Sequence, residues 1–372
     1  MKQDFYLGTS SSNYLGNLIE KYNPNKILII RGKNSYFASG ANKSIYNATK
    51  GRNIDLLYFS DFGENPKIDD VYKGLSQISN ESIDLIIGIG GGSVLDMAKL
   101  IRFLHSYDVD ENFSKHIKKR NLIPLICIPT TAGTGSEATH FAVVYKDKIK
   151  YSLEHDEVLP NVAIVDPIFT YNISPYITAC TGFDALAQAI EAYWNINSTE
   201  ESDEYAIKAI KLLYSNLDIV VNKPTVISRN FVSEGSYWAG RAINITKTTA
   251  PHAFSYPFTT YYGYPHGHAV ALTFPFFMKY NFDYSNNNKN FNIDIDKFTA
   301  KKNKLFNILK FKNSDDVSIK LKQYLINIGL SLNLPENFDM SLIISNINID
   351  RLKNNPLTLE AKDVNSIIES IF

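Results

Sequence analysis

The chain has 372 residues, of which 44% are hydrophobic and 20% charged, and 38 basic residues balance 38 acidic ones. This length exceeds one typical core and predicts two domains, while the absence of a net charge argues against nucleic acid or a membrane surface as the partner. With two cysteines, no apolar signal segment and no apolar run of the roughly 20 residues that a membrane span needs, the composition indicates a reduced, cytoplasmic protein.

Short, continuously apolar runs recur through the first half of the chain. We predict strands at residues 26–30, 54–59, 83–89, 122–128, 141–145, 150–152 and 162–165. Helical segments follow the first three strands, toward Tyr46, at residues 68–78 and from Val94. Strands without polar alternation, separated by helices, predict a parallel sheet that is covered on both faces.

The pattern changes from about Ile173, where apolar residues recur at helical spacing and turns become sparse. Helices are predicted at residues 201–217, 226–245, 269–280 and in several stretches after Lys301. The asparagine-rich segment 283–298 is predicted to be an exposed loop. We therefore expect an α/β domain with a Rossmann-like parallel sheet at residues 1–170, followed by an all-α domain at residues 171–372.

Two loops rich in glycine and hydroxyl groups each follow a predicted parallel strand. The first, residues 88–96, opens a helix, where backbone N–H groups and the helix N-terminus attract an anion. The second covers residues 130–136. Ligands of open α/β sheets bind outside the carboxyl ends of the strands, so the pair favours a dinucleotide site over two tight turns, although neither loop has the G-x-G-x-x-G spacing. The candidate cofactor-binding residues are Gly90, Gly91, Gly92, Ser93, Asp96, Thr130, Thr131 and Thr134.

Three of the seven histidines fall within residues 248–268. His252 follows a proline and His266 lies between a proline and a glycine, so stiff backbone offers two imidazoles. Upstream, Asp184 and Gln188 stand four apart on a predicted helix and share one of its faces. The four side chains form an oxygen and nitrogen donor set for a divalent metal. In the alternative, the histidines are core residues, Asp184 caps its helix and Gln188 is exposed.

The motifs resemble, in their order, those of the iron-dependent (group III) alcohol dehydrogenases. The resemblance covers the chain from about Lys26 to Phe274. It rests on residues 90–93, 129–137, 159–160, 163–167, 181–186, 251–253 and 265–267. The resemblance implies a dinucleotide-binding domain, a helical metal-binding domain, a cleft between them and the architecture shared with dehydroquinate synthases.

Carried over to this sequence, the resemblance implies four ligands for Fe²⁺ or another divalent metal, namely Asp184, Gln188, His252 and His266. It also places Lys150 near the nicotinamide and the substrate. Two positions depart from the family. Gln188 stands where a histidine is usual, which puts the affinity for metal in question. Tyr256 replaces a further active-site histidine, which leaves the proton donor open.

Both departures, with residues 188–200 and 241–252, resemble the phosphonoacetaldehyde reductases of phosphonate biosynthesis. A phosphonate dianion needs cations in its pocket, and Arg241 and Lys247 precede His252 by about one to three helical turns. The alternative is that both are solvated surface charges. We therefore expect reduction of phosphonoacetaldehyde to 2-hydroxyethylphosphonate. The other candidates are a general short-chain alcohol dehydrogenase, a non-redox enzyme resembling dehydroquinate synthase, and a binding protein whose metal site has decayed.

The choice between NADH and NADPH depends on the turn after the first strand. Gly32 stands where many NAD-specific relatives carry an aspartate for the ribose hydroxyls, and Arg31 or Lys33 could meet a 2′-phosphate. Exposed charges that make no contact with the cofactor are the alternative. The resemblance further implies a homodimer or a larger homo-oligomer.

Overall fold

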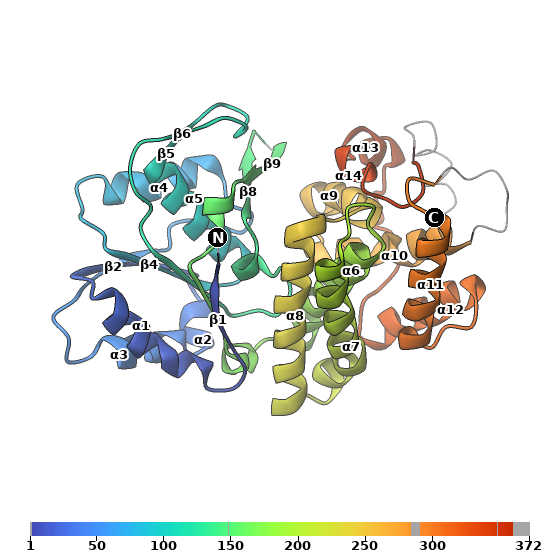
Figure 1. The fold of residues 1–372 in the computed structure, drawn as a ribbon, viewed down its shortest axis with the longest axis horizontal. Coiled ribbons are helices and arrows are strands. Elements are labelled where there is room, and N and C mark those ends of the chain that lie inside the picture. Colours follow the sequence, from blue (N-terminus) through green and yellow to red (C-terminus); the bar gives the residue numbers. More distant parts are fainter. Residues whose placement is uncertain (1, 148, 284–290, 348, 360–372) are drawn as a thin grey trace. The chain divides into compact units, whose positions relative to one another are not determined.

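The computed structural model describes residues 2–147, 149–283, 291–347 and 349–359. The chain divides into two compact units, Met1–Ile173 and Ser174–Phe372. In Figure 1 the first unit runs from blue to green and the second continues to red. The sequence patterns placed the corresponding boundary between residues 170 and 171.

The first unit is built on a six-stranded sheet in the order β1-β10-β7-β4-β2-β3. Its strands are β1 (Asp4–Leu7), β2 (Lys26–Arg31), β3 (Asp55–Phe59), β4 (Leu85–Gly90), β7 (Leu125–Pro129) and β10 (Val162–Val165). Every pairing is parallel, which confirms the predicted sheet. Strand β1 was missed because it lies at the edge, where two of its four residues are exposed and no apolar run marks it.

Helices cover both faces of this sheet (Figure 1). They are α1 (Tyr14–Tyr22), α2 (Ser35–Ala38), α3 (Ala41–Thr49), α4 (Ile68–Ile78) and α5 (Gly92–Ser106). Successive residues of β2 enter different cores: Ile27 and Ile29 pack with α1 and α3, whereas Leu28 and Ile30 pack with α4 and α5. Burial on both faces explains why the strand sequences show no polar alternation.

Two antiparallel ribbons and four short 3₁₀ helices complete the first unit. The ribbon strands are β5 (Tyr107–Val109) with β6 (His116–Lys118), and β8 (Phe141–Lys146) with β9 (Ile149–Glu154). The 3₁₀ helices are η1 (Ser11–Asn13), η2 (Ser136–Ala138), η3 (Asp156–Val158) and η4 (Pro167–Thr170). The strands predicted at residues 141–145 and 150–152 therefore pair with each other and do not join the parallel sheet.

In the described part of the second unit, the regular secondary structure is helical, apart from one isolated bridge between Phe291 and Leu357. Its helices are α6 (Pro175–Trp194), α7 (Glu200–Asn222), α8 (Val226–Thr246), α9 (Ala250–Tyr262), α10 (His266–Phe282), α11 (Ile295–Leu309), α12 (Ser314–Asn327), α13 (Met340–Ser345) and α14 (Ile349–Leu352). Thr199 and Thr225 start α7 and α8 with capping boxes.

The helix predicted at residues 226–245 is α8, which ends at Thr246, so Arg241 lies on α8 and His252 on α9. One sequence-based expectation in this unit needs correction. The predicted loop at 283–298 is wrong from Ile295 onward, where α11 begins behind the cap of Asp294, and its residues 284–290 lie outside the described residues. Across the described ranges, no helix combines the length and the apolar character that crossing a membrane requires.

Candidate metal centre and cofactor loops

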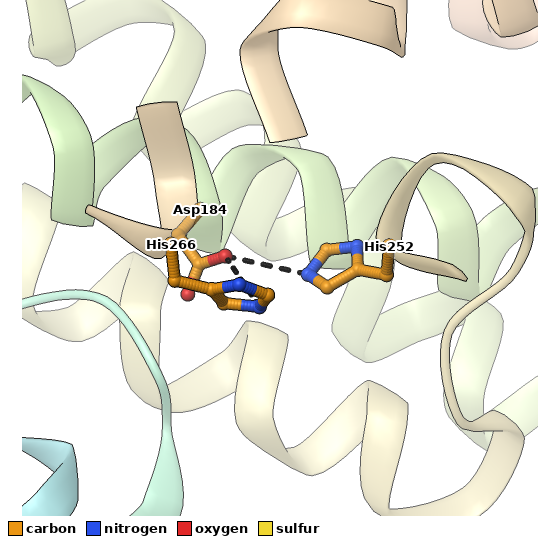
Figure 2. Close-up of side chains that lie close together, drawn as sticks. All are labelled: Asp184, His252 and His266. Atoms are coloured by element: carbon orange, nitrogen blue, oxygen red, sulfur yellow. Dashed lines mark ion pairs between the residues drawn. The ribbon is translucent and has the colours of Figure 1, made fainter. Parts of the chain in front are cut away.

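Three predicted ligands from three helices of the second unit converge at one point (Figure 2). Asp184 comes from α6, His252 from α9 and His266 from α10, and we call them the metal cluster. Their donor atoms lie within 4.8 Å of one another, with Asp184 Oδ1 3.3 Å from His252 Nε2 and 3.8 Å from His266 Nε2. Metal–ligand bonds of about 2.0–2.2 Å place neighbouring donors at roughly this separation. The cluster therefore fits a single divalent cation.

The approach of α10 to α6 depends on Gly267. A Cβ atom at this position would lie 1.9 Å from the carbonyl oxygen of Cys180 and 2.9 Å from Cβ of Asp184. Only glycine lets the first turn of α10 pack this closely against α6. The residue next to His266 thus sets how near its imidazole comes to Asp184.

Gln188 lies beside Asp184 in the buried face of α6. Its Nε2 donates a hydrogen bond of 3.0 Å to Asp184 Oδ2, and both residues are buried. The alternative of a helix cap and an exposed glutamine is wrong, since Ser174 caps α6. Gln188 Oε1 is buried and has no hydrogen-bond partner among the described residues. The amide nitrogen thus orients the carboxylate, and the amide oxygen is the candidate fourth donor.

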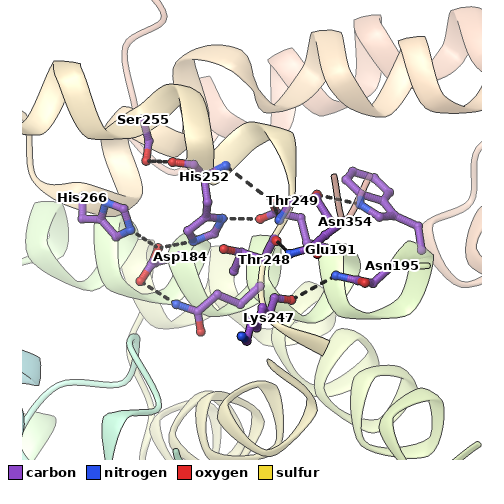
Figure 3. A network of polar contacts seen from close by, with 12 residues as sticks. Asp184, Glu191, Asn195, Lys247, Thr248, Thr249, His252, Ser255, His266 and Asn354 are labelled. Carbon is purple, nitrogen blue, oxygen red and sulfur yellow. Dashed lines mark hydrogen bonds and ion pairs between the residues drawn. The ribbon is translucent and has the colours of Figure 1, made fainter. Parts of the chain in front are cut away.

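A buried glutamate that the sequence analysis did not single out supports His252 from behind. Glu191 is fully buried, and its Oε2 is hydrogen-bonded to His252 Nδ1 (Figure 3). Its Oε1 accepts bonds of 2.9 Å from both N and Oγ1 of Thr249. Such a carboxylate fixes the histidine tautomer and would direct Nε2 toward a bound metal. Glu191 follows Gln188 by three positions on the same helix face, and this spacing could have revealed it.

The environment of His252 also sets its protonation. Burial lowers the pKa of this imidazole, but the Glu191 and Asp184 carboxylates outweigh burial and raise it to about 10. His252 Nε2 is buried, and the described part of the chain supplies it with no hydrogen-bond acceptor of suitable geometry. A metal ion would displace this proton and satisfy the buried nitrogen, so the donor set fits Fe²⁺ or another divalent ion.

The neighbouring aromatic and histidine residues divide into two roles. The Tyr256 ring stacks on His266, with ring centroids 5.8 Å apart and planes 12° from parallel. His268 is a core residue: its Nδ1 meets the Tyr176 hydroxyl at 2.8 Å and its Nε2 meets the carbonyl of Ser331 at 2.6 Å. Of the three histidines in residues 248–268, His268 is therefore the one for which the alternative interpretation as a core residue holds.

The two predicted substrate cations occupy different surroundings. Arg241 is half-buried in α8, with its guanidinium 5.0 Å from the centre of the Tyr205 ring and Nη2 3.9 Å from Glu201 Oε1. These contacts hold Arg241 against α7. Lys247 is half-buried and follows the last residue of α8, two positions before Thr249, which donates hydrogen bonds to Glu191.

In the first unit, the two glycine-rich loops touch each other. Thr130 N donates to the carbonyl of Gly90 at 2.8 Å, and a Cβ atom on Gly92 would lie 2.6 Å from Cγ2 of Thr134. Gly91 precedes the first turn of α5, and the first backbone N–H groups of a helix can bind an anion. The structure thus brings the predicted cofactor-binding residues of the two loops to one edge of the sheet.

Asp96 and Lys99 fasten these loops to the β8–β9 ribbon. Asp96 Oδ1 accepts from Ser136 Oγ at 2.5 Å and Oδ2 accepts from Val143 N at 3.1 Å. The buried Lys99 ammonium donates to Ser136 Oγ at 3.0 Å and lies 3.8 Å from Asp96. Burial raises the pKa of Asp96, and the positive charges of Lys99 and of Lys150 in β9 oppose this effect. Asp96 therefore positions the loops, and Lys150 lies within electrostatic range of it.

Arg31 stands at the carboxyl end of β2, next to Gly32. Its guanidinium lies 5.0 Å from the centre of the Tyr36 ring, 5.2 Å from that of Phe37 and 5.8 Å from that of Tyr58. A Cβ atom on Gly32 would lie 2.1 Å from Ser35 Oγ, so a larger residue there would require the Ser35 side chain to rotate. The aromatic rings hold a cation at the place predicted for the cofactor ribose.

Comparisons with known proteins agree with these features. Residues 3–167 match the model of iron-containing alcohol dehydrogenases, and residues 178–372 match the C-terminal model of the same family. Long-chain-alcohol dehydrogenase 1 of Geobacillus thermodenitrificans is 37% identical over 216 residues, which cover 56% of this chain and 54% of that protein. NAD-dependent methanol dehydrogenase of Bacillus methanolicus is 29% identical over 266 residues, or 70% of each chain.

Similarity to solved structures extends over nearly the whole chain. The structure of sulfoacetaldehyde reductase from Bifidobacterium kashiwanohense, in complex with NAD⁺, has a TM-score of 0.85 and 28% identity and covers 99% of this chain and 96% of that one. In contrast, the chain spans about half the length of the curated relatives it matches first, at 54% and 55% for two of them.

Proposed function

The chain belongs to the iron-containing alcohol dehydrogenase family, and we propose that it is a metal-dependent oxidoreductase that uses NAD(P)H to reduce a small aldehyde to a primary alcohol. The observation that carries this proposal is the metal cluster with its buried support. Asp184, His252 and His266 would hold the ion, and Gln188 Oε1 would complete the donor set. A bound divalent metal stabilises the negative charge that develops on the aldehyde oxygen as hydride arrives.

The residues around the metal cluster would hold its side chains in the orientation that metal binding needs. Glu191 holds His252 in one tautomer, Gln188 Nε2 orients Asp184, and Tyr256 packs against the His266 ring. Tyr256 is also our candidate for holding a proton near the product oxygen, because its phenol lies beside a ligand and can donate a hydrogen bond.

In the first unit, residues 90–93 and 130–136 would bind the pyrophosphate of the dinucleotide at the N-terminus of α5. Lys150 would contribute positive charge near the nicotinamide. NADPH is allowed because Gly32 provides no carboxylate and Arg31 is held close by, whereas the similar sulfoacetaldehyde reductase structure contains NAD⁺. We therefore propose that both cofactors are used.

The proposed substrate is an aldehyde that carries an anionic group, with phosphonoacetaldehyde as the first choice and 2-hydroxyethylphosphonate as its product. Sequence features shared with the phosphonoacetaldehyde reductases support this choice. The similar sulfoacetaldehyde reductase supports the broader class, since sulfonate and phosphonate are both tetrahedral oxyanions. Lys247 is the favoured cation, because its turn leads into the segment that supports His252, whereas Arg241 lies against α7. Relatives named for methanol and 1-propanol favour the second candidate, a neutral short-chain aldehyde.

The test is an anaerobic assay of NADH and NADPH oxidation after reconstitution with Fe²⁺. The substrates are phosphonoacetaldehyde, sulfoacetaldehyde, acetaldehyde and propionaldehyde, and the controls are metal-free protein and Asp184→Asn. We expect net oxidation of the cofactor that depends on metal and is fastest with the anionic aldehydes. If no aldehyde supports net oxidation in the metal-loaded protein, the proposed function is wrong. Turnover without net oxidation would favour a dehydroquinate synthase-like cycle.

A further inference from the structure

Lys247 has a backbone conformation that residues other than glycine rarely adopt. It is the C-terminal cap of α8, with φ 65° and ψ −173°. Positive φ with ψ near 180° is essentially a glycine region, since the Cβ atom of any other residue meets its own backbone. This is not the usual left-handed end of a helix, in which ψ is near +45°. Lys310 shows that usual end in this chain, with φ 58° and ψ 37°.

The surrounding residues hold the Lys247 backbone in this conformation. Asn195 is fully buried, and its Nδ2 donates to the carbonyls of Thr246 at 3.0 Å and of Lys247 at 3.3 Å. Thr246 Oγ1 also donates to the Lys247 carbonyl, at 2.9 Å. Asn354 Nδ2 donates to the carbonyl of Thr248 at 3.0 Å (Figure 3). The strained turn is therefore fixed from both sides, and the strain is not relieved by a small shift of the loop.

The same turn is connected to the metal cluster through Glu191. Thr249, two residues after Lys247, gives its N–H and its hydroxyl to Glu191, which in turn holds His252. The Trp194 indole adds a further bond of 2.9 Å to Thr249 Oγ1. Relaxing the turn would disturb the support of His252, so the backbone geometry is required. A glycine would satisfy that geometry without strain, whereas the chain carries a long cationic side chain there.

We propose that the Lys247 ammonium binds the tetrahedral oxyanion of an anionic aldehyde, which is a phosphonate or a sulfonate. The strained backbone at the end of α8 then lowers the stability of the protein, and the ammonium selects the substrate. An ammonium offers three N–H donors and one positive charge, which suit three oxygens on one phosphorus or sulfur atom. Lys247 precedes His252 by five positions in the chain (252 − 247), and its turn leads into the segment that supports this histidine. This inference rests on the proposed function and extends it to the residue that selects the substrate.

The experiment compares Lys247→Gly, Lys247→Ala and Lys310→Gly. The alanine variant removes the charge and keeps the strain, whereas the glycine variant removes both. Thermal unfolding of the metal-free proteins should give Lys247→Gly a midpoint about 2–4 °C above that of Lys247→Ala. Both Lys247 variants should lose on the order of 10–100-fold in the ratio of kcat/KM for phosphonoacetaldehyde or sulfoacetaldehyde to kcat/KM for propionaldehyde.

Lys310→Gly is the matched control, since it relieves a positive φ at another helix end and should leave this ratio unchanged. Comparing the two anionic aldehydes shows which oxyanion the site prefers. The inference is overturned if Lys247→Ala keeps the wild-type ratio, or if Lys247→Gly unfolds no later than Lys247→Ala. Failure of the proposed function has a different signature, because the wild-type protein would then oxidise no cofactor with any aldehyde, whatever the unfolding temperatures.

Discussion

At the scale of single residues, the site depends on which buried polar atoms have partners. Glu191 has four hydrogen bonds to the segment from Thr249 to His252, and it leaves His252 Nε2 for a metal. A buried carboxylate is retained only where such bonds compensate for its lost hydration. We therefore expect Glu191 to prepare His252 for binding a metal ion.

Replacing this carboxylate should weaken the metal site. Glu191→Gln keeps the shape but removes the charge that favours one His252 tautomer and opposes the charge of the metal. We expect the affinity for Fe²⁺ or Co²⁺ to fall about 10–100-fold, measured by anaerobic titration followed by metal analysis. Glu204→Gln, at an exposed site in α7, is the control. Equal affinities in the two variants would show that Glu191 has no influence on the ligand.

A second residue-scale prediction concerns Glu137 in η2, which is buried in the first unit. Burial raises the pKa of its carboxyl from 4.5 to about 7. Between these values the folded state binds more protons than the unfolded state, so the free energy of unfolding falls as the pH rises, and the full loss is reached above pH 7.

Glu137→Gln should remove this dependence. We expect the free energy of unfolding of Glu137→Gln, relative to that of the wild type, to increase by on the order of 2 kcal/mol between about pH 5 and about pH 8. Urea unfolding at each pH measures this difference. Glu111→Gln, at an exposed site, serves as the control and should follow the wild-type profile. Parallel profiles for Glu137→Gln and the wild type would contradict the prediction.

At the scale of elements, the metal centre is a junction of three helices. Ser174 and Pro175 start α6, Pro251 stands in the first turn of α9, and Pro265 precedes α10, so each helix begins at a defined residue. The close contact of α10 with α6 at Gly267 then determines how near His266 comes to Asp184. The positions of the ligands thus follow from helix starts and from one small residue.

Gly267→Ala should separate α6 from α10. Its Cβ atom would meet the backbone of Cys180 at 1.9 Å, and a backbone atom cannot move aside as the end of a side chain can. We expect a loss of stability of about 1–3 kcal/mol by urea unfolding and a reduced metal content after reconstitution. The control is Gly16→Ala in α1, whose Cβ atom would meet nothing within 4 Å and which should be neutral or stabilising. Full metal content in stable Gly267→Ala would refute this account of the junction.

At the scale of the whole molecule, the two units carry separate parts of the proposed chemistry. The metal cluster and its support belong to Ser174–Phe372, whereas both glycine-rich loops belong to Met1–Ile173. Each ligand should therefore stabilise first the unit that binds it, because binding to the folded state alone shifts the unfolding equilibrium.

This separation can be measured by hydrogen exchange. Fe²⁺ at about 100 times its Kd should add about 2.7 kcal/mol of protection to α6, α9 and α10, and NADPH should protect residues 90–96 and 130–136. Asp184→Asn should abolish the effect of the metal and retain that of the dinucleotide. Protection of the first unit by metal alone would contradict the assignment of the ligands.

The sequence by itself determined most of the succession of strands and helices along the chain, the parallel sheet and the membership of the family. Apolar runs such as residues 26–30 and 85–89 are buried on both faces of the sheet, and this environment is recorded locally in their composition. The candidate ligands were also visible, because prolines and glycines around His252 and His266 mark positions where the backbone is constrained. Edge strand β1 and the start of α11 escaped prediction, since neither has a continuous apolar pattern.

Only the tertiary structure decided which side chains act together. It showed the distances between Asp184 and two histidines 68 and 82 positions further along the chain (252 − 184 and 266 − 184), a grouping that the sequence analysis predicted. It also assigned His268 to the core and placed Arg241 against α7. It also revealed the support by Glu191 and the glycine-like backbone of Lys247. Local sequence patterns report the burial of a residue and its helix face, whereas contacts between distant helices depend on how those helices pack.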